Sequence, residues 1–146
     1  PSWSRGLGDV YKRQEEFIEG SEITVAMVGE DIFPAVEIIP DDGFYDFNSK
    51  YNSKNTSYEK ANYELSREKE LIKYSKTINK DFGCTGWSRI DLIDDGKGFY
   101  FLELNTVPGM TNSSLVPKAA SFAGVEFNQL VIKIIQSSLD KKDIKM

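Results

Sequence analysis

Residues 87–105 read WSRIDLIDDGKGFYFLELN, and this stretch decides the fold that the sequence can adopt. Apolar residues surround Arg89 and Asp91 in its first part, and Glu103 and Asn105 in its last part, as expected of two β-strands. The DDGKG segment between the two parts is a strong hairpin signal. The stretch therefore predicts two antiparallel strands joined by a tight turn.

The polar residues of this hairpin are expected to share a site. Side chains alternate between the two faces of a strand, so Glu103 projects together with Asn105. By the same rule Asp91 projects with Arg89, and strict alternation gives Phe101 the face of Glu103. Antiparallel pairing would bring two carboxylates and one amide oxygen together, and such hard donors suit Mg²⁺. The alternative is a solvated polar face on a two-stranded ribbon.

Composition narrows the classes of function. The chain has 146 residues, enough for one domain, and its net charge of -5 argues against a nucleic-acid partner. The single cysteine, Cys84, allows no intrachain disulfide, which fits a reducing compartment. Histidine is absent, so any chemistry must use other side chains and a hard metal. Without a long apolar run, we expect a soluble, cytoplasmic protein with no membrane partner.

Three motifs resemble a known enzyme family. They are GWSRID at residues 86–91, FLELNTVPGMT at residues 101–111 and SLVP at residues 114–117. In this order and spacing they are similar to the C-terminal part of D-alanine–D-alanine ligases, which belong to the ATP-grasp superfamily. The resemblance covers residues 15–139. It implies an α+β fold, the ATP-grasp C-terminal domain, in which helices pack on a mostly antiparallel sheet beside a long active-site loop.

The resemblance assigns roles to the hairpin and the loop after it. It implies that Asp91, Glu103 and Asn105 hold Mg²⁺ (or Mn²⁺) at the phosphates of ATP. It also implies that Arg89 and the backbone N–H of Gly109 are catalytic and face the oxyanion of a tetrahedral intermediate. The residue types fit these roles, because Gly109 lets the backbone approach closely and Arg89 supplies a fixed charge.

The substrates are assigned in the same way. The resemblance implies that Ser114 and the backbone at Leu115 bind the carboxylate of the second D-alanine. In the polar stretch 41–62, which we interpret as a long loop, Lys50 would reach the phosphates of ATP and act in catalysis. Tyr51 would shape the substrate pocket, and a tyrosine at this position goes with an amine acceptor.

The segment EEFIEGSE near the N-terminus resembles the part of the family that holds the adenine and ribose of ATP. Glu15 would accept from the adenine amino group, Phe17 would pack beside the ring, and the backbone at Ile18 would contact it. Glu22 would bind the ribose hydroxyls. The alternative is a charged turn between strands.

The remaining pattern predicts two strands at 23–28 and 32–39, with Pro34 marking an edge or bulge. It also predicts helices over 66–82, from Ser113-Ser114 to Gly124, and over 126–139. The apolar residues expected to face inward are Leu71, Tyr74, Ile78 and Phe82 in the first helix and Phe127, Leu130, Val131, Ile134 and Ile135 in the last.

Three parts are expected along the chain. Residues 1–14 have no clean period, and we interpret them as a foreign lead-in, with a divergent native segment as the alternative. Residues 15–139 form the domain, and residues 140–146 a charged tail. The family runs to about twice this length and usually forms dimers, so we expect a homodimer only at full length.

The resemblance implies ATP-dependent ligation of two D-alanines to D-alanyl-D-alanine for peptidoglycan synthesis, with D-alanine and ATP as the small-molecule substrates. Because the N-terminal half of such an enzyme is missing, we expect no catalysis by this chain alone. Two alternatives stay open: another ATP-grasp carboxylate–amine ligase, and a non-catalytic nucleotide-binding module.

Overall fold

The computed structural model of the protein describes residues 16–40 and 56–139, and within them six strands form one antiparallel sheet accompanied by three helices. The strands are β1 (Ser21–Val28), β2 (Asp31–Ile32), β3 (Val36–Ile39), β4 (Ser57–Lys60), β5 (Trp87–Asp94) and β6 (Phe99–Asn105). The helices are α2 (Leu65–Asp81), α3 (Leu115–Phe122) and α4 (Phe127–Leu139). The strand order is β4-β3-β1-β5-β6, and β2 pairs with β1. The expected mostly antiparallel sheet is confirmed.

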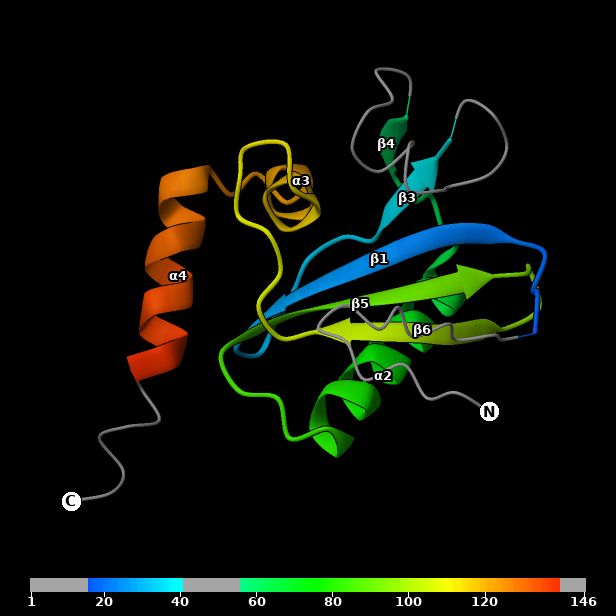
Figure 1. The fold of residues 1–146 in the computed structure, drawn as a ribbon, viewed down its shortest axis with the longest axis horizontal. Helices are drawn as coiled ribbons and strands as arrows, with labels where there is room; N and C mark the ends of the chain where they lie inside the picture. The colour runs from blue at the N-terminus through cyan, green and yellow to red at the C-terminus, as the bar shows by residue number, and fades with distance from the viewer. Residues whose placement is uncertain (1–15, 41–55, 140–146) are drawn as a thin grey trace, which may run out of the picture.

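Helices cover both faces of the sheet, α2 on one side and α3 on the other, with α4 beside α3 (Figure 1). Strand β1 alternates between the two cores. Ile23 and Val25 belong to the core under α2, whereas Ala26 and Val28 belong to the core under α3 and α4. The sheet is therefore buried on both sides, which explains why its central strands carry near-continuous apolar runs.

Two strand boundaries differ from the sequence expectation. The expected strand 32–39 is interrupted between β2 and β3, at the segment that contains Pro34, which has no N–H to donate to a ladder. Part of the expected loop 41–62 forms β4, whose Tyr58 pairs with Ile38 and packs against the core under α3. The sequence hides β4 because it is an edge strand of four residues with one apolar ring.

Helix α2 buries a different face from the expected one. It begins at Leu65 with Glu64 as its N-cap, so Ser66 lies inside the helix rather than at its start. Leu71 and Ile78 face the core, as expected. Tyr74 and Phe82 are exposed, and Ser75 is buried on the same face as Leu71 and Ile78. Similarly, Ile135 of α4 is exposed rather than inward.

Strand β6 contains a bulge that overturns strict alternation. Asp91 pairs with Glu103, but its neighbour Leu92 pairs with Phe101, so Leu102 is the extra residue. Directly opposite residues share a face, which places Phe101 on the α2 side with Leu92, where its ring lies 5.8 Å from that of Phe82. The expectation that Phe101 shares the face of Glu103 is therefore wrong. The bulge lets the aromatic end of β6 face α2 while its polar end faces α3.

Candidate active site

The polar end of the hairpin gathers four side chains. Asp91 lies directly opposite Glu103, and Arg89 lies directly opposite Asn105. All four share the face of the sheet that is turned toward α3, because Asp91 and Arg89 pair on their other side with Thr24 and Ala26 of β1. The structure thus brings together the four hairpin residues that the sequence singled out.

Asp91 is the most buried member of the group, with 6% of its surface exposed. Arg89 donates to both of its carboxylate oxygens, from Nε to Oδ1 at 2.9 Å and from Nη2 to Oδ2 at 2.6 Å. The fully buried Thr24 donates from Oγ1 to Oδ1 at 2.6 Å. A buried carboxylate is costly without hydrogen-bond partners, and these contacts fix its orientation.

Asn105 links the two carboxylates. Its Nδ2 lies 2.9 Å from Glu103 Oε1 and 3.4 Å from Asp91 Oδ2. Rotating the amide by 180° would put Oδ1 in the place of Nδ2, so that three oxygens would converge on one point. This donor set fits Mg²⁺, although Arg89, with Nη2 3.7 Å from Glu103 Oε1, balances the negative charge in the structure described.

These residues line a cleft of about 630 Å³ between the sheet and the loop that leads to α3. The hairpin residues form one wall, and Gly109, Ser114 and Leu115 contribute to the other. The cleft is polar where the carboxylates lie, and it is wide enough for a small charged molecule between the two walls.

The loop wall is held by hydroxyl groups. Thr111 donates its N–H to Ser114 Oγ at 3.0 Å, and the two side-chain oxygens lie 2.8 Å apart. A Cβ added to Gly109 would lie 3.1 Å from the same Ser114 oxygen, so glycine permits this close approach. Ser114 is the N-cap of α3 but makes no side-chain cap bond, so its hydroxyl does not occupy the N–H groups of Leu115 and Val116, and Pro117 has no N–H.

A second cleft, of about 690 Å³, adjoins the first one. Phe17 and Ile18 line it on one side, and Ile93 and Leu102 on another. Glu22 and Ile38 line both clefts, so the two lie next to each other. The lining also includes four glutamates, Glu16, Glu19, Glu22 and Glu37. A cleft with apolar walls and carboxylates in its lining can hold a flat ring with polar substituents.

Three predicted site residues cannot be placed. Glu15, Lys50 and Tyr51 lie outside the described residues. The others lie in one cleft or the other.

Sequence reasoning missed two residues that organise the site. Thr24, whose hydroxyl holds Asp91, is the only polar residue in the apolar run 23–28, and that exception was the available signal. Thr111, which holds Ser114, stands within a quoted motif but was given no role.

The chain matches a known family over most of its length. The family model described as "D-ala D-ala ligase C-terminus" matches residues 14–136. The chain belongs to this family. The resemblance seen in the three motifs is thereby confirmed, as is the fold that it implied.

The curated relatives that match the chain are named D-alanine–D-alanine ligases. The D-alanine–D-alanine ligase of Haemophilus influenzae (strain PittEE) is 46% identical over 127 residues, which are 86% of this chain and 43% of that protein. The D-alanine–D-alanine ligase of Actinobacillus succinogenes is 44% identical over 128 residues, which are 86% of this chain and 41% of that protein. The chain therefore spans less than half the length of these relatives.

Solved structures have the same fold. A D-alanine–D-alanine ligase from Bacillus anthracis, complexed with ATP, superposes with a TM-score of 0.77 at 29% identity over 90% of this chain and 42% of that one. The VanG D-Ala:D-Ser ligase from Enterococcus faecalis gives a TM-score of 0.68 at 32% identity over 83% of this chain and 37% of that one.

Within residues 16–40 and 56–139, no group of three or more His, Cys, Asp or Glu side chains could hold a metal ion. The hairpin set consists of two carboxylates with the amide of Asn105 beside them. None of the helices in the described part of the chain is both long and apolar enough to cross a membrane.

Proposed function

We propose that this chain is the C-terminal part of a ligase that uses ATP to join two D-alanines into D-alanyl-D-alanine for peptidoglycan synthesis, releasing ADP and phosphate. The observation that carries the proposal is the convergence of Asp91, Glu103 and Asn105 beside Arg89 in a cleft. The names of the relatives support the reaction, and the ATP bound to one solved relative supports the nucleotide.

Asp91, Glu103 and Asn105 would hold Mg²⁺, or Mn²⁺ in its place. The metal would supply neutralisation of phosphate charge during phosphoryl transfer to a carboxylate. The part played by the protein is orientation. Thr24 and Arg89 fix the Asp91 carboxylate, so its oxygens need not reorganise when the phosphates arrive.

Arg89 and Gly109 would act when an amine attacks the acyl phosphate. Negative charge then develops on the carbonyl oxygen, and the Arg89 guanidinium with the Gly109 N–H would stabilise it. Ser114 and the Leu115 backbone at the start of α3 would bind the carboxylate of the second D-alanine, where the helix dipole favours an anion. Lys50, outside the described residues, would contact the phosphates and the acyl phosphate.

The second cleft would hold the nucleoside. Phe17 and the backbone at Ile18 would contact the adenine ring, Glu22 would accept from the ribose hydroxyls, and Glu15 would accept from the adenine amino group. The support is that Phe17, Ile18 and Glu22 line one cleft, and that Glu22 also lines the cleft that contains Asp91 and Glu103. A nucleotide lying across both would put its base beside Phe17 and its phosphates beside Asp91.

The acceptor is proposed to be an amine, and specifically D-alanine. Tyr51 is the residue on which this choice rests, because its hydroxyl can join a hydrogen-bonded chain that an apolar ring cannot. One solved relative is a D-Ala:D-Ser ligase, so D-serine is the competing amine acceptor. We further propose that the complete protein is cytoplasmic and homodimeric, and that it has no nucleic-acid or membrane partner.

The test replaces the corresponding part of the Haemophilus influenzae ligase by residues 16–139 of this chain, and measures phosphate release with ATP, Mg²⁺ and D-alanine. We expect activity from the chimera and none from the 146-residue chain, because positioning supplies much of the rate in phosphoryl transfer. D91N should abolish the activity, whereas E30Q, on an exposed turn, should keep it.

The two alternatives predict other results in the same assay. An inactive chimera that still binds ATP would favour a nucleotide-binding module. A chimera that releases phosphate only with other amino acids would favour a different carboxylate–amine ligase.

A further inference from the structure

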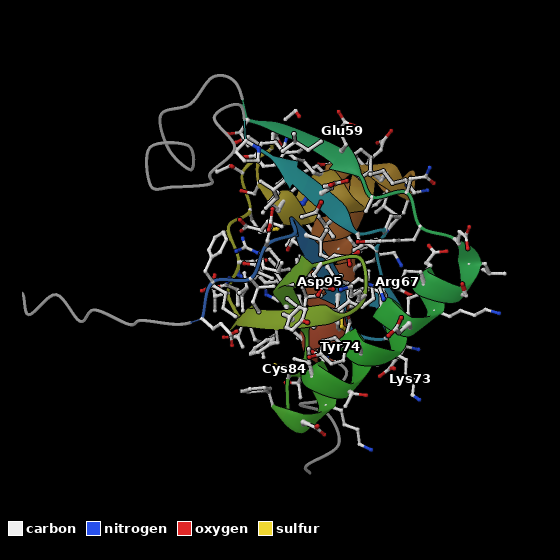
Figure 2. All side chains as sticks on the ribbon, turned by 90° about the vertical axis from the view of Figure 1, so that its right-hand side faces the viewer. Glu59, Arg67, Lys73, Tyr74, Cys84 and Asp95 are labelled. Carbon is white, nitrogen blue, oxygen red and sulfur yellow. The ribbon has the colours of Figure 1, made fainter. Side chains whose placement is uncertain are left out.

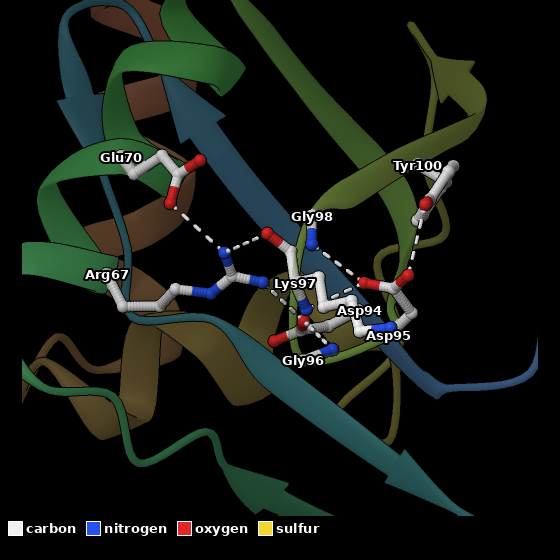
Figure 3. A network of polar contacts seen from close by, with 8 residues as sticks. All are labelled: Arg67, Glu70, Asp94, Asp95, Gly96, Lys97, Gly98 and Tyr100. Carbon is white, nitrogen blue, oxygen red and sulfur yellow. Dashed lines mark hydrogen bonds and ion pairs between the residues drawn. The ribbon is translucent and has the colours of Figure 1, made fainter.

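The turn of the β5–β6 hairpin is tied to α2 by one arginine, Arg67 (Figure 3). Its Nη2 lies 2.6 Å from Asp94 Oδ1, and its Nη1 donates to the Lys97 carbonyl at 3.2 Å. Its Nη1 also lies 3.1 Å from Glu70 Oε2, within the same helix. The guanidinium therefore bridges the first turns of α2 and both sides of the hairpin turn.

The same guanidinium covers an aromatic ring of β6. Its Cζ lies 4.0 Å from the centre of the Phe99 ring, and Tyr63 packs edge-on against that ring at 5.8 Å. Arg67 is mostly covered, with 19% of its side chain exposed, and Asp94 has 10% exposed. A partly buried ion pair with a stacked ring is worth more than a surface salt bridge.

Hydrogen bonds connect the residues of the turn to one another, so a contact that fixes one of them restrains the others. Asp94 Oδ1 accepts from the Gly96 N–H at 2.8 Å, and Asp95 Oδ1 accepts from the Gly98 N–H at 2.7 Å. Asp95 Oδ2 also accepts from the Tyr100 hydroxyl at 3.0 Å. These bonds make the turn and the start of β6 one unit, which Arg67 fastens to α2.

This unit supports two walls of the second cleft, which is named the nucleoside cleft because it is proposed to hold the nucleoside. The first wall is the segment that carries Phe17 and Ile18 and ends at Gly20. A Cβ on Gly20 would collide with the backbone oxygen of Asp94 and lie 2.8 Å from its carbonyl carbon, so the Gly20 backbone rests directly on Asp94. Asp94 therefore connects the two: its side chain binds Arg67, and its backbone contacts the segment that ends at Gly20.

The second wall depends on the bulge in β6. If β6 alternated regularly from Glu103, Phe101 would oppose Ile93 and Phe99 would oppose Asp95, outside the ring stack beneath Arg67. Only the extra residue, Leu102, lets Phe99 face α2 while Glu103 still opposes Asp91. The contact between Arg67 and Phe99 thus selects the bulged register, and the bulge puts Leu102 on the cleft wall.

We propose that Arg67, which lines neither cleft, is a positioning residue for the nucleoside cleft. Its contact with Asp94 fixes the position of the Gly20 backbone, and its contact with Phe99 stabilises the bulge at Leu102. This inference rests on the proposed nucleotide function for its ligand, but the register of β6 can be tested without any ligand. The carboxylate end of β6 keeps its pairing in either register, so the effect is confined to the nucleoside cleft.

The charge state of Asp94 agrees with this role. Burial raises the pKa of its carboxyl, but hydrogen bonds from the Gly96 N–H, Tyr63 and Arg67 outweigh burial and hold the pKa below the ordinary value. Asp94 is therefore ionised at neutral pH, as its ion pair with Arg67 requires.

The test compares R67M, R67K and K73M in the 146-residue chain by NMR. Lys73 projects from α2 into solvent, and K73M is the matched control (Figure 2). Cross-strand nuclear Overhauser contacts report the register, and titration with AMP reports the nucleoside cleft. For R67M we expect the Leu92–Phe101 contact to give way to an Ile93–Phe101 contact, and the AMP dissociation constant to rise about fivefold.

R67K, which keeps the charge but loses the planar fork and the stacking, should give a smaller shift, and K73M none. If R67M does not fold, the comparison of R67K with K73M decides. An R67M chain that keeps the Leu92–Phe101 contact and the original AMP affinity, while its unfolding midpoint falls, would reduce Arg67 to a stabilising residue and overturn the proposal. Failure of the unsubstituted chain to bind AMP would contradict the nucleotide function instead, and the register measurement would then decide the role of Arg67.

Discussion

Thr24 donates a hydrogen bond of 2.6 Å to Asp91 across the β1–β5 pair, although both residues are buried in the sheet. The hydroxyl is one of the donors that fix the orientation of this carboxylate. Thr24→Val keeps the shape of the side chain and removes that donor. We expect the free energy of unfolding to fall by about 1–3 kcal/mol, as for a buried group that loses a hydrogen bond. Urea denaturation measures it, and Thr24→Ser, which keeps the hydroxyl, is the control. Equal stability of the Val and Ser variants would contradict the assigned role.

Arg89 balances the Asp91 charge through two hydrogen bonds. Arg89→Met leaves a buried carboxylate without its cation, and we expect a loss of about 3 kcal/mol in the free energy of unfolding. Adding Asp91→Asn to that variant should recover part of the loss, because the uncompensated charge disappears. A double-mutant cycle in urea measures the coupling. Strictly additive effects of the two substitutions would mean that the pair is not energetically coupled.

Gly109 approaches the hydroxyl of Ser114 closely. The Cβ of an alanine there would lie 3.1 Å from Ser114 Oγ, so the serine or the loop must give way by a few tenths of an ångström. In the chimeric ligase we expect Gly109→Ala to raise the KM for the acceptor D-alanine by about tenfold, because it displaces Ser114, which is proposed to bind the carboxylate of that D-alanine. Gly98→Ala is the control, since its Cβ would meet Tyr100 at an ordinary 3.8 Å. An unchanged acceptor KM would separate this loop from the acceptor site.

Much of the site could be predicted because its polar residues and the turn that pairs them lie close together in the sequence. The DDGKG turn and the polarity of Glu103 and Asn105 lie within one short stretch, so their pairing with Asp91 follows from the register. The bulge at Leu102 could not be predicted, because it depends on the contact between Phe99 and Arg67, which belongs to a helix far away in the sequence. Local alternation contains no information about that contact.

The helix faces were harder to predict for a similar reason. Tyr74 and Phe82 are apolar enough to suggest a buried face, but the buried residues of α2 are Leu71, Ser75 and Ile78. The orientation of a helix on a sheet is set by all the packed side chains together, so hydrophobic spacing alone does not identify the buried face. Strand β4 was missed because its pairing with β3 is what makes it a strand.

Tyr63 and Asp94, which lie beside Arg67, should make the stability of the protein depend on pH. Burial, and then the neighbouring Asp94 carboxylate, raise the pKa of Tyr63 well above its ordinary value, whereas the pKa of Asp94 is lowered. The stabilisation from Tyr63 is present below about pH 10 and is lost as the pH rises beyond that toward the folded-state pKa. The stabilisation from Asp94 is present above about pH 4 and is lost as the pH falls through its lowered pKa. Thermal unfolding across pH should show both losses.

The matching substitutions test both contributions and their coupling. Tyr63→Phe should remove the alkaline loss and weaken the acid loss, because the Tyr63 hydroxyl helps to lower the pKa of Asp94. Asp94→Asn should remove the acid loss and weaken the alkaline loss, because the Asp94 carboxylate helps to raise the pKa of Tyr63. A Tyr63→Phe chain that still loses stability above pH 10 as steeply as the unsubstituted chain would assign that loss to another group.

Asn105 provides the sharpest test of the metal site, because its amide must turn over when a cation binds. The structure has Nδ2 of Asn105 facing Glu103 and Asp91, whereas a cation would require Oδ1 in that place. Adding Mn²⁺ to the chain should therefore broaden the side-chain amide signals of Asn105 before those of residues on α2. Asn105→Asp adds a third carboxylate and should tighten Mn²⁺ binding, while Glu103→Gln should weaken it about tenfold. Glu30→Gln removes an equal charge from an exposed turn and should leave the titration unchanged. If Glu30→Gln weakens Mn²⁺ binding as much as Glu103→Gln does, the cation is held by the net charge of the chain, and the hairpin is not its site.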